Sequence, residues 1–144
     1  WSIIVIGMIV INYILLANLY LFRINSLRYL LIPAVMYWMY FFFNALIIHR
    51  QAVKSVAKIN KIIDKGVYSI VRHPMYSSDI ILGIGIFFFR PTIRMLAIIV
   101  WMTIFLLFWM KIEEKGLEDK FGDEYRKYKK RVNMVLPIKK RCKL

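Results

Sequence analysis

The sequence is poor in the residues that hold small proteins together by covalent or metal cross-links. Its 144 residues include one cysteine, Cys142, and two histidines, His49 and His73. One cysteine cannot build a disulfide framework or a cysteine-based zinc site, and two histidines are too few for a multi-histidine metal centre. The glycine fingerprints of dinucleotide-binding and P-loop folds are also absent from the sequence. We therefore expect no metal site and no soluble nucleotide-binding fold.

Acidic residues are scarce as well. Eight Asp and Glu stand against 22 Lys and Arg, so the formal net charge is +14, while 60% of the residues are hydrophobic. A soluble domain of this size could not bury so much apolar surface, and a disordered chain would not contain it. The basic residues form no recognisable nucleic-acid-binding domain. The composition therefore indicates an integral membrane protein with basic cytoplasmic parts.

Four apolar stretches predict an all-α membrane protein with about four transmembrane helices. They cover residues 1–22, 30–48, 80–89 and 92–110. A span needs about 20 residues to cross the hydrocarbon core. The third stretch approaches that length only if its helix begins near Pro74, which gives a short span to Phe89 and a hairpin with the fourth.

Positive charge predicts the orientation of these spans. The segment 50–72 carries six Lys and Arg and the tail from Lys111 carries twelve, whereas the turns on the opposite side carry four. Cationic loops stay in the cytoplasm. We expect a multi-pass protein with both ends of the chain in the cytoplasm, and no cleavable signal peptide in the first stretch. We divide the chain into two N-terminal spans, residues 1–49, and a core, residues 50–144, that contains the cytoplasmic loop, the helical hairpin and the cytoplasmic tail.

The tail carries a helical stripe of apolar and aromatic residues at steps of three and four: Leu117, Phe121, Tyr125, Tyr128 and Val132. Gly122 followed by Asp123 predicts a helix stop and a new N-cap. The last span therefore continues to about Phe121, and a basic amphipathic helix covers about 124–131. That helix is suited either to adhere to anionic lipid or to close a site.

Three polar features are candidates for chemistry. Pro74 suits the first turn of a helix, which places His73 at its N-cap, where an anionic group could bind; the alternative is an ordinary helix start with Arg72 snorkelling to the interface. Glu113 and Glu114 follow the fourth span and could hold a cation, or could form a solvated pair. Asp79 is an ionisable residue inside the third span, where it needs a partner.

Together these motifs resemble a known family. The chain reads Gly-Val-Tyr at 66–68, Arg-His-Pro-Met-Tyr at 72–76, then a predicted hairpin, then Glu-Glu at 113–114 and Phe-Gly-Asp-Glu-Tyr at 121–125. This order and spacing, from about 60 to 137, resembles the integral-membrane methyltransferases typified by isoprenylcysteine carboxyl methyltransferase, with the phospholipid methyltransferases as relatives.

The resemblance implies S-adenosylmethionine as methyl donor and S-adenosylhomocysteine as product. Carried over position by position, the donor contacts fall on ten residues: Asn60, Lys61, Ile62, Ile63, Tyr68, His73, Pro74, Met75, Tyr76 and Glu113. No catalytic residue is assigned; His73, Tyr76 and Glu113 position the reactants. The active site is expected on the cytoplasmic side, open to a lipophilic or lipidated acceptor from the bilayer.

The acceptor is expected to be a carboxylate of the isoprenylcysteine type, although one position departs from the family. Carboxyl methyltransferases carry an arginine four residues before the first glutamate of the pair, and this chain has Trp109 there. Lys111 is the nearest cation, and Asp79 is a candidate proton acceptor for an amine substrate. The alternatives are a phospholipid amine N-methyltransferase and a non-catalytic membrane protein that binds anionic lipid through its tail. The sequence leaves the oligomeric state open.

Overall fold

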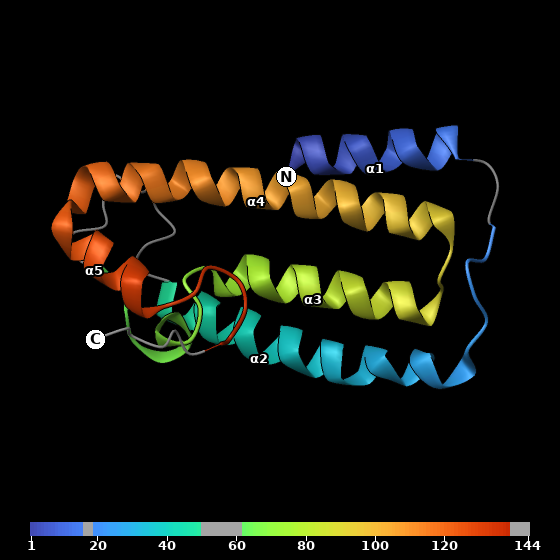
Figure 1. Cartoon of the computed structure of the whole chain (residues 1–144), viewed down its shortest axis with the longest axis horizontal. Coiled ribbons are helices and arrows are strands. Elements are labelled where there is room, and N and C mark those ends of the chain that lie inside the picture. Colours follow the sequence, from blue (N-terminus) through green and yellow to red (C-terminus); the bar gives the residue numbers. More distant parts are fainter. Residues whose placement is uncertain (16–18, 50–61, 139–144) are drawn as a thin grey trace. The chain divides into compact units, whose positions relative to one another are not determined.

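The computed structural model describes residues 1–15, 19–49 and 62–138. Within these ranges the chain is helical and contains no strand, which agrees with the predicted all-α class (Figure 1). The helices are α1 (Ser2–Ile14), η1 (Asn25–Leu30), α2 (Leu31–His49), η3 (Gly66–Ser69), α3 (Pro74–Phe89), α4 (Ile93–Phe121) and α5 (Asp123–Arg131), where η marks a short 3-10 helix.

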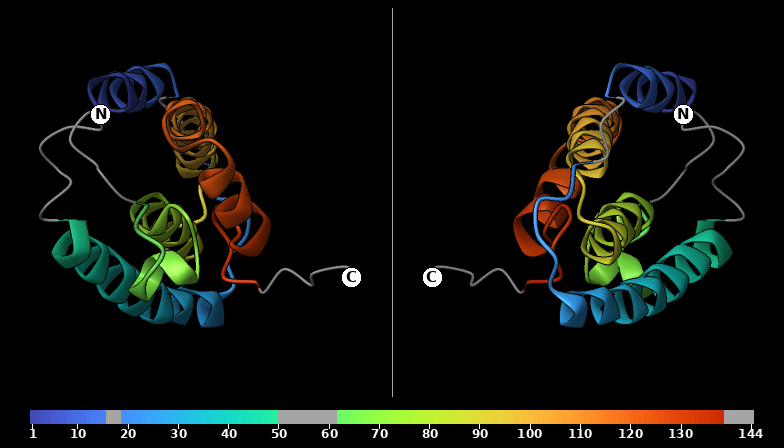
Figure 2. Two further views of the ribbon diagram at one scale, coloured as in Figure 1. Left: turned by 90° about the vertical axis from the view of Figure 1, so that its left-hand side faces the viewer. Right: turned by 90° about the vertical axis from the view of Figure 1, so that its right-hand side faces the viewer.

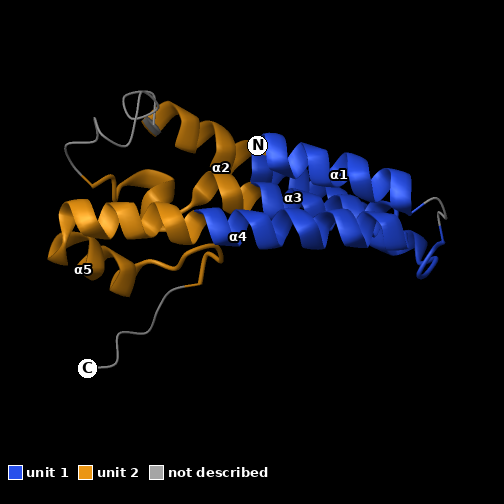
Figure 3. Cartoon of the chain, turned by 90° about the horizontal axis from the view of Figure 1, so that it is seen from above, with its two compact units in different colours: residues 1–38, 79–109 blue, residues 39–78, 110–144 orange. Residues whose placement is uncertain are grey.

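The chain forms two compact units that are interleaved along the sequence (Figure 3). Unit 1 comprises residues 1–38 and 79–109, and unit 2 comprises residues 39–78 and 110–144. The two units are defined by the contacts within each of them. The predicted division at residue 49 instead separates segments by their expected roles, and it stays a prediction. Everything described below as a functional site belongs to unit 2.

Unit 1 is held together by close approaches between apolar helices. A methyl group added at Gly85 of α3 would lie 2.5 Å from Cβ of Ala34 in α2, and one at Gly83 would lie 3.0 Å from Cε of Met102 in α4. Glycine therefore permits both approaches. The end of α1 is fixed by Arg94, whose guanidinium donates to the carbonyl of Leu15 at 2.7 Å, and α1 lies alongside α4 (Figure 2).

The first apolar stretch differs from the prediction. It is not one helix over residues 1–22, because α1 ends at Ile14 and the chain from residue 19 is extended. There the backbone pairs with the α3–α4 turn: the amide of Leu21 donates to Pro91 at 2.9 Å, and that of Ile93 donates to Leu19 at 3.0 Å. Apolar composition alone does not decide between helix and extended chain, since both can satisfy the backbone.

Two helical segments are long and apolar enough to cross a membrane, namely Asn25–Ile48 and Ile93–Phe121. In their most apolar windows only 17% and 11% of the residues are buried, so their apolar side chains face outward. A soluble protein rarely exposes so much apolar surface. Helix α3 is shorter, with 16 residues, and begins at Pro74 as predicted.

Unit 2 contains the charged end of α4 and the amphipathic helix α5. Helix α4 continues past its apolar part, residues 93–110, and ends at Phe121 as predicted. Gly122 then adopts φ +53°, a conformation that favours glycine, and α5 follows directly. The N-cap of α5 is therefore Gly122 and not Asp123, which is already the first helical residue. The predicted stripe is confirmed: its residues pack together, and Tyr125 and Tyr128 are buried.

Candidate functional site

The Arg-His-Pro segment is held by backbone pairing with the tail. The amide of Arg72 donates to the carbonyl of Asn133 at 2.8 Å, and the amide of His73 donates to that of Met134 at 3.2 Å. Beside them, the Ser77 hydroxyl donates to the Val135 carbonyl at 2.6 Å. The first turn of α3 is thereby fixed against a segment about 60 residues further along the chain.

Arg72 is the centre of a buried polar network. Its Nε donates to Oε1 of Glu114 at 2.7 Å, and its Nη1 donates to the carbonyls of Lys129 and Val132 at 3.0 and 2.8 Å. Both charged side chains of the Arg72–Glu114 pair are only 7% exposed. The interpretation of Arg72 as a snorkelling side chain is therefore wrong, because the guanidinium binds the end of α5 inside unit 2.

Glu114 is satisfied by protein groups on both oxygens. Besides Arg72, its Oε1 lies 3.3 Å from Nε2 of His73, and its Oε2 lies 3.2 Å from Nζ of Lys129. The two adjacent glutamates therefore differ in role: Glu114 belongs to the network that holds α5 against the start of α3. Only Glu113 is left to receive a ligand.

Because of the buried Glu114 carboxylate, we expect the folded protein to lose stability in acid. Burial would raise its pKa, but the His73 hydrogen bond and the Arg72 charge outweigh burial and hold the pKa at about 2, below the ordinary 4.5. A carboxyl with a lowered native pKa stabilises the fold fully above its unfolded pKa, and this contribution is lost as the pH falls through the native value. The free energy of unfolding of the wild type should therefore fall between about pH 5 and pH 2.

The measurement compares the wild type with Glu114→Gln over this range in detergent micelles. The variant lacks the titrating group, so the stability gap between the two proteins should narrow as the pH falls from 5 to 2. A gap that stays constant across the range would show that the Glu114 carboxylate does not titrate as described.

Glu113 and His73 form the polar corner of the site. His73 is 6% exposed, and its ring stacks on Tyr76 at a centroid distance of 5.7 Å. Its Nδ1 lies 3.9 Å from Oε2 of Glu113, which is too far for a hydrogen bond. Oε2 of Glu113 is buried and has no hydrogen-bond partner among the described residues. A buried carboxylate oxygen without a hydrogen-bond partner is uncommon in folded proteins, which makes Glu113 a candidate ligand-binding residue.

A cavity of about 240 Å³ lies beside this corner, within unit 2. Its volume is close to the lower end of the range for small-molecule sites, about 300 Å³. The loop before α3, the first turn of α3, the end of α4 and helix α5 all contribute to its wall. The lining residues are Ile62, Ile63, Tyr68, Arg72, His73, Pro74, Met75, Tyr76, Glu113, Leu117, Phe121, Tyr125 and Tyr128.

The predicted donor contacts from Ile62 to Glu113 all line this one cavity. Asn60 and Lys61 lie outside the described residues. The three residues proposed for the acceptor are not in its lining: Trp109 and Lys111 are exposed on α4, and Asp79 of unit 1 accepts a hydrogen bond from Nε1 of Trp38 at 2.8 Å.

Several lining residues were not predicted as site residues. Leu117, Phe121, Tyr125 and Tyr128 belong to the apolar stripe of the tail, whose helix is predicted either to adhere to lipid or to close a site, and no donor contact is predicted on them. That stripe was the available signal, since a helix that covers a site must turn its apolar face to it. Arg72 is the other addition, and its place in the Arg-His-Pro-Met-Tyr motif was the available signal.

Comparison with known families agrees with these motifs. The model of the phospholipid methyltransferase family matches residues 9–124, which is most of the chain. The chain belongs to the phospholipid methyltransferase family. The resemblance identified from the Arg-His-Pro-Met-Tyr and Glu-Glu motifs is thereby confirmed. No solved structure matches this member of the family.

Two curated relatives of this family member are bacterial proteins. Methanethiol S-methyltransferase of Pseudomonas deceptionensis is 40% identical over 76 residues, which cover 51% of this chain and 28% of the relative. Methanethiol S-methyltransferase 1 of Bradyrhizobium diazoefficiens is 38% identical over 73 residues, which cover 49% of this chain and 24% of the relative. Each alignment thus covers about a quarter of the relative's length.

Proposed function

We propose that this chain carries the donor-binding site of an S-adenosylmethionine-dependent membrane methyltransferase, and that the site is the cavity of unit 2. One observation carries the proposal: Glu113, whose buried Oε2 has no hydrogen-bond partner among the described residues, lines a cavity together with the family motifs. Membership of a methyltransferase family supports the reaction class.

The lining residues suit such a donor chemically. When bound, S-adenosylmethionine supplies a methyl group activated on a sulfonium cation. Glu113 offers a negative charge to the cationic part, and the start of α3 offers the positive potential of a helix N-terminus to the anionic part. Tyr68 and Tyr76 offer aromatic faces, which attract cations and stack on bases. The residues therefore fit the group that the family implies.

The proposed topology keeps four spans. Helices α2 and α4 have the required length, and the shorter α1 and α3 add two apolar segments. The excess of Lys and Arg in the segment 50–72 and in the tail supports a cytoplasmic location for both ends and for the site. A water-soluble donor would then reach the cavity from the cytoplasm.

A small thiol is the acceptor that we favour over the expected isoprenylcysteine carboxylate. The two curated relatives are named as methanethiol S-methyltransferases. A carboxylate acceptor would call for an orienting cation, yet the only Lys or Arg in the described lining is Arg72, whose Nε and Nη1 are already bonded. A thiol would need no orienting cation: it would lose its proton to solvent, and its sulfur would then take the methyl group, with S-adenosylhomocysteine as the leaving group.

Direct binding and methyl transfer test the proposal together. In lipid nanodiscs, calorimetry should detect one S-adenosylhomocysteine site per chain. With S-adenosylmethionine labelled in the methyl group, label should pass to an alkanethiol rather than to a prenylcysteine carboxylate or to phosphatidylethanolamine. Label in the carboxylate or the amine would agree with methyltransferase activity but would overturn the proposal that a thiol is the acceptor. Failure to bind S-adenosylhomocysteine would overturn the methyltransferase and leave a non-catalytic membrane protein.

A further inference from the structure

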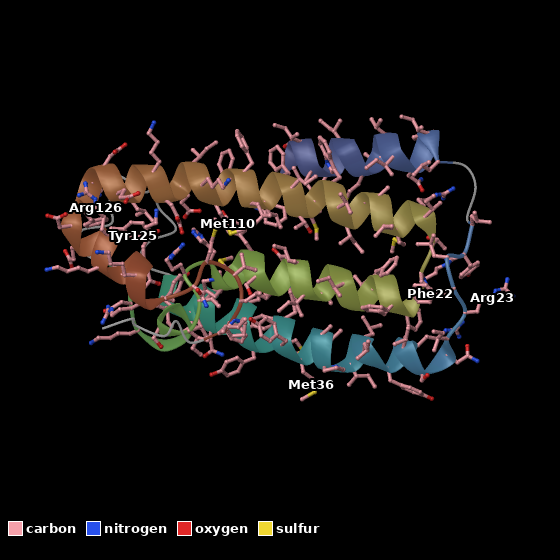
Figure 4. All side chains as sticks on the ribbon, in the orientation of Figure 1. Phe22, Arg23, Met36, Met110, Tyr125 and Arg126 are labelled. Atoms are coloured by element: carbon pink, nitrogen blue, oxygen red, sulfur yellow. The ribbon has the colours of Figure 1, made fainter. Side chains whose placement is uncertain are left out.

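A second residue of the cavity lining carries a buried polar atom that has no hydrogen-bond partner among the described residues. Tyr125 on α5, labelled in Figure 4, is 2% exposed and lines the cavity. Its hydroxyl is buried and has no hydrogen-bond partner among the described residues. The neighbouring Tyr128 is different, because its hydroxyl donates to the carbonyl of Tyr68 at 2.7 Å. A buried hydroxyl is costly when it is left without a hydrogen-bond partner, which makes the Tyr125 hydroxyl a candidate ligand contact.

The two groups without a hydrogen-bond partner among the described residues have opposite hydrogen-bonding character. Glu113 offers carboxylate oxygens, which accept hydrogen bonds. Tyr125 keeps its proton, because burial and then the nearby negative charge of Glu114 raise the pKa of its hydroxyl. A neutral hydroxyl donates to an anion, and a carboxylate accepts from a cation. One end of the donor carries such a pair of opposite charges, namely the ammonium and carboxylate of its amino-acid part.

The rest of the cavity wall suits the other end of the donor. Ile62, Ile63, Leu117 and Phe121 supply apolar and aromatic surface, which is the environment that a purine base prefers. The polar corner is formed by Glu113, His73 and the start of α3. The lining therefore contains both charged and apolar groups, as the donor itself does.

We propose that Tyr125 binds the α-carboxylate of the donor through its hydroxyl, while Glu113 accepts hydrogen bonds from the α-ammonium. The inference rests on the proposed function and gives α5 a direct part in it. The amphipathic helix of the tail then completes the donor site. This assigns a binding role to a residue that the motif comparison left without one.

The test compares two ligands and two tyrosine variants in nanodiscs. S-Adenosylhomocysteine carries the carboxylate, and decarboxylated S-adenosylhomocysteine lacks it. Tyr125→Phe should lower the affinity for S-adenosylhomocysteine by at least about tenfold, because it removes a hydrogen bond to a charged group. The same variant should change the affinity for the decarboxylated ligand by less than about twofold. Tyr29→Phe, at a residue 72% exposed in unit 1, is the matched control and should change neither affinity.

Tyr125→Phe should also fold, because it removes a hydroxyl that lacks a partner in the described structure. Unchanged affinity for S-adenosylhomocysteine would overturn the proposal, and so would an equal loss with both ligands, which would place the contact on the adenosine part or in the fold. A wild type that binds neither ligand would instead overturn the proposed function. The two failures are therefore distinguishable.

Discussion

Arg72→Ala is expected to destabilise the protein by about 3–5 kcal/mol, the cost of removing one partner from a buried ion pair. The substitution leaves the Glu114 carboxylate, in a residue 5% exposed, without its shortest contact. It also removes the donor to two carbonyls at the end of α5. The change can be measured as the free energy of unfolding in detergent micelles, followed by tryptophan fluorescence.

Arg131→Ala is the matched control for this prediction. Its guanidinium pairs with Asp64 at 3.1 Å, but the two side chains are 62% and 41% exposed. Exposed pairs contribute about 0–1 kcal/mol, so this loss should be small. If Arg72→Ala cost no more than Arg131→Ala, the buried network would not be what holds α5. Arg72→Lys should fall between them, because lysine keeps the charge but not the planar set of donors.

Glu113→Gln is expected to weaken binding of S-adenosylhomocysteine by a factor on the order of 100, since it removes a charged acceptor worth about 2–3 kcal/mol. The variant should fold normally, because Oε2 of Glu113 makes no hydrogen bond within the described residues. Calorimetry on the wild type and the variant measures the effect. The melting temperature, recorded in the same samples, reports on the fold.

Glu124→Gln provides the control for removal of a negative charge. Glu124 is exposed on α5 and does not line the cavity, so its loss should change affinity by less than about twofold. Because we place Glu113 at the ammonium, Glu113→Gln should weaken S-adenosylmethionine and S-adenosylhomocysteine alike. If Glu113→Gln lowered the affinity for S-adenosylmethionine alone, the contact of Glu113 would be with the sulfonium instead. Normal affinity in Glu113→Gln would remove Glu113 from the site.

The sequence predicted the local elements of unit 2 well. Pro74 marked the start of α3, and the apolar stripe with Gly122 marked the end of α4 and the presence of α5. These signals are local, because a helix start depends on proline chemistry and a sharp helix junction on glycine. The donor contacts predicted from the motifs, from Ile62 to Glu113, all line one cavity.

The sequence could not separate the roles of Glu113 and Glu114. Successive residues on a helix point about 100° apart, so adjacent glutamates face different neighbours, and only packing decides which one meets Arg72. The same holds for Asp79, whose partner Trp38 is 41 residues away. The extended segment at residues 19–24 was also missed, because its pairing with the α3–α4 turn is set by tertiary contacts.

The pairing of the Arg-His-Pro segment with residues 133–135 has a consequence for biosynthesis. Val71 and Asn133 form a parallel bridge across 62 positions, so the ribosome must complete α3, α4 and α5 before the two can meet. The nascent chain therefore holds Arg72 and His73 without these partners while its apolar helices are being inserted. The cavity of unit 2 can form only after that, so its assembly is a late event in the maturation of the protein.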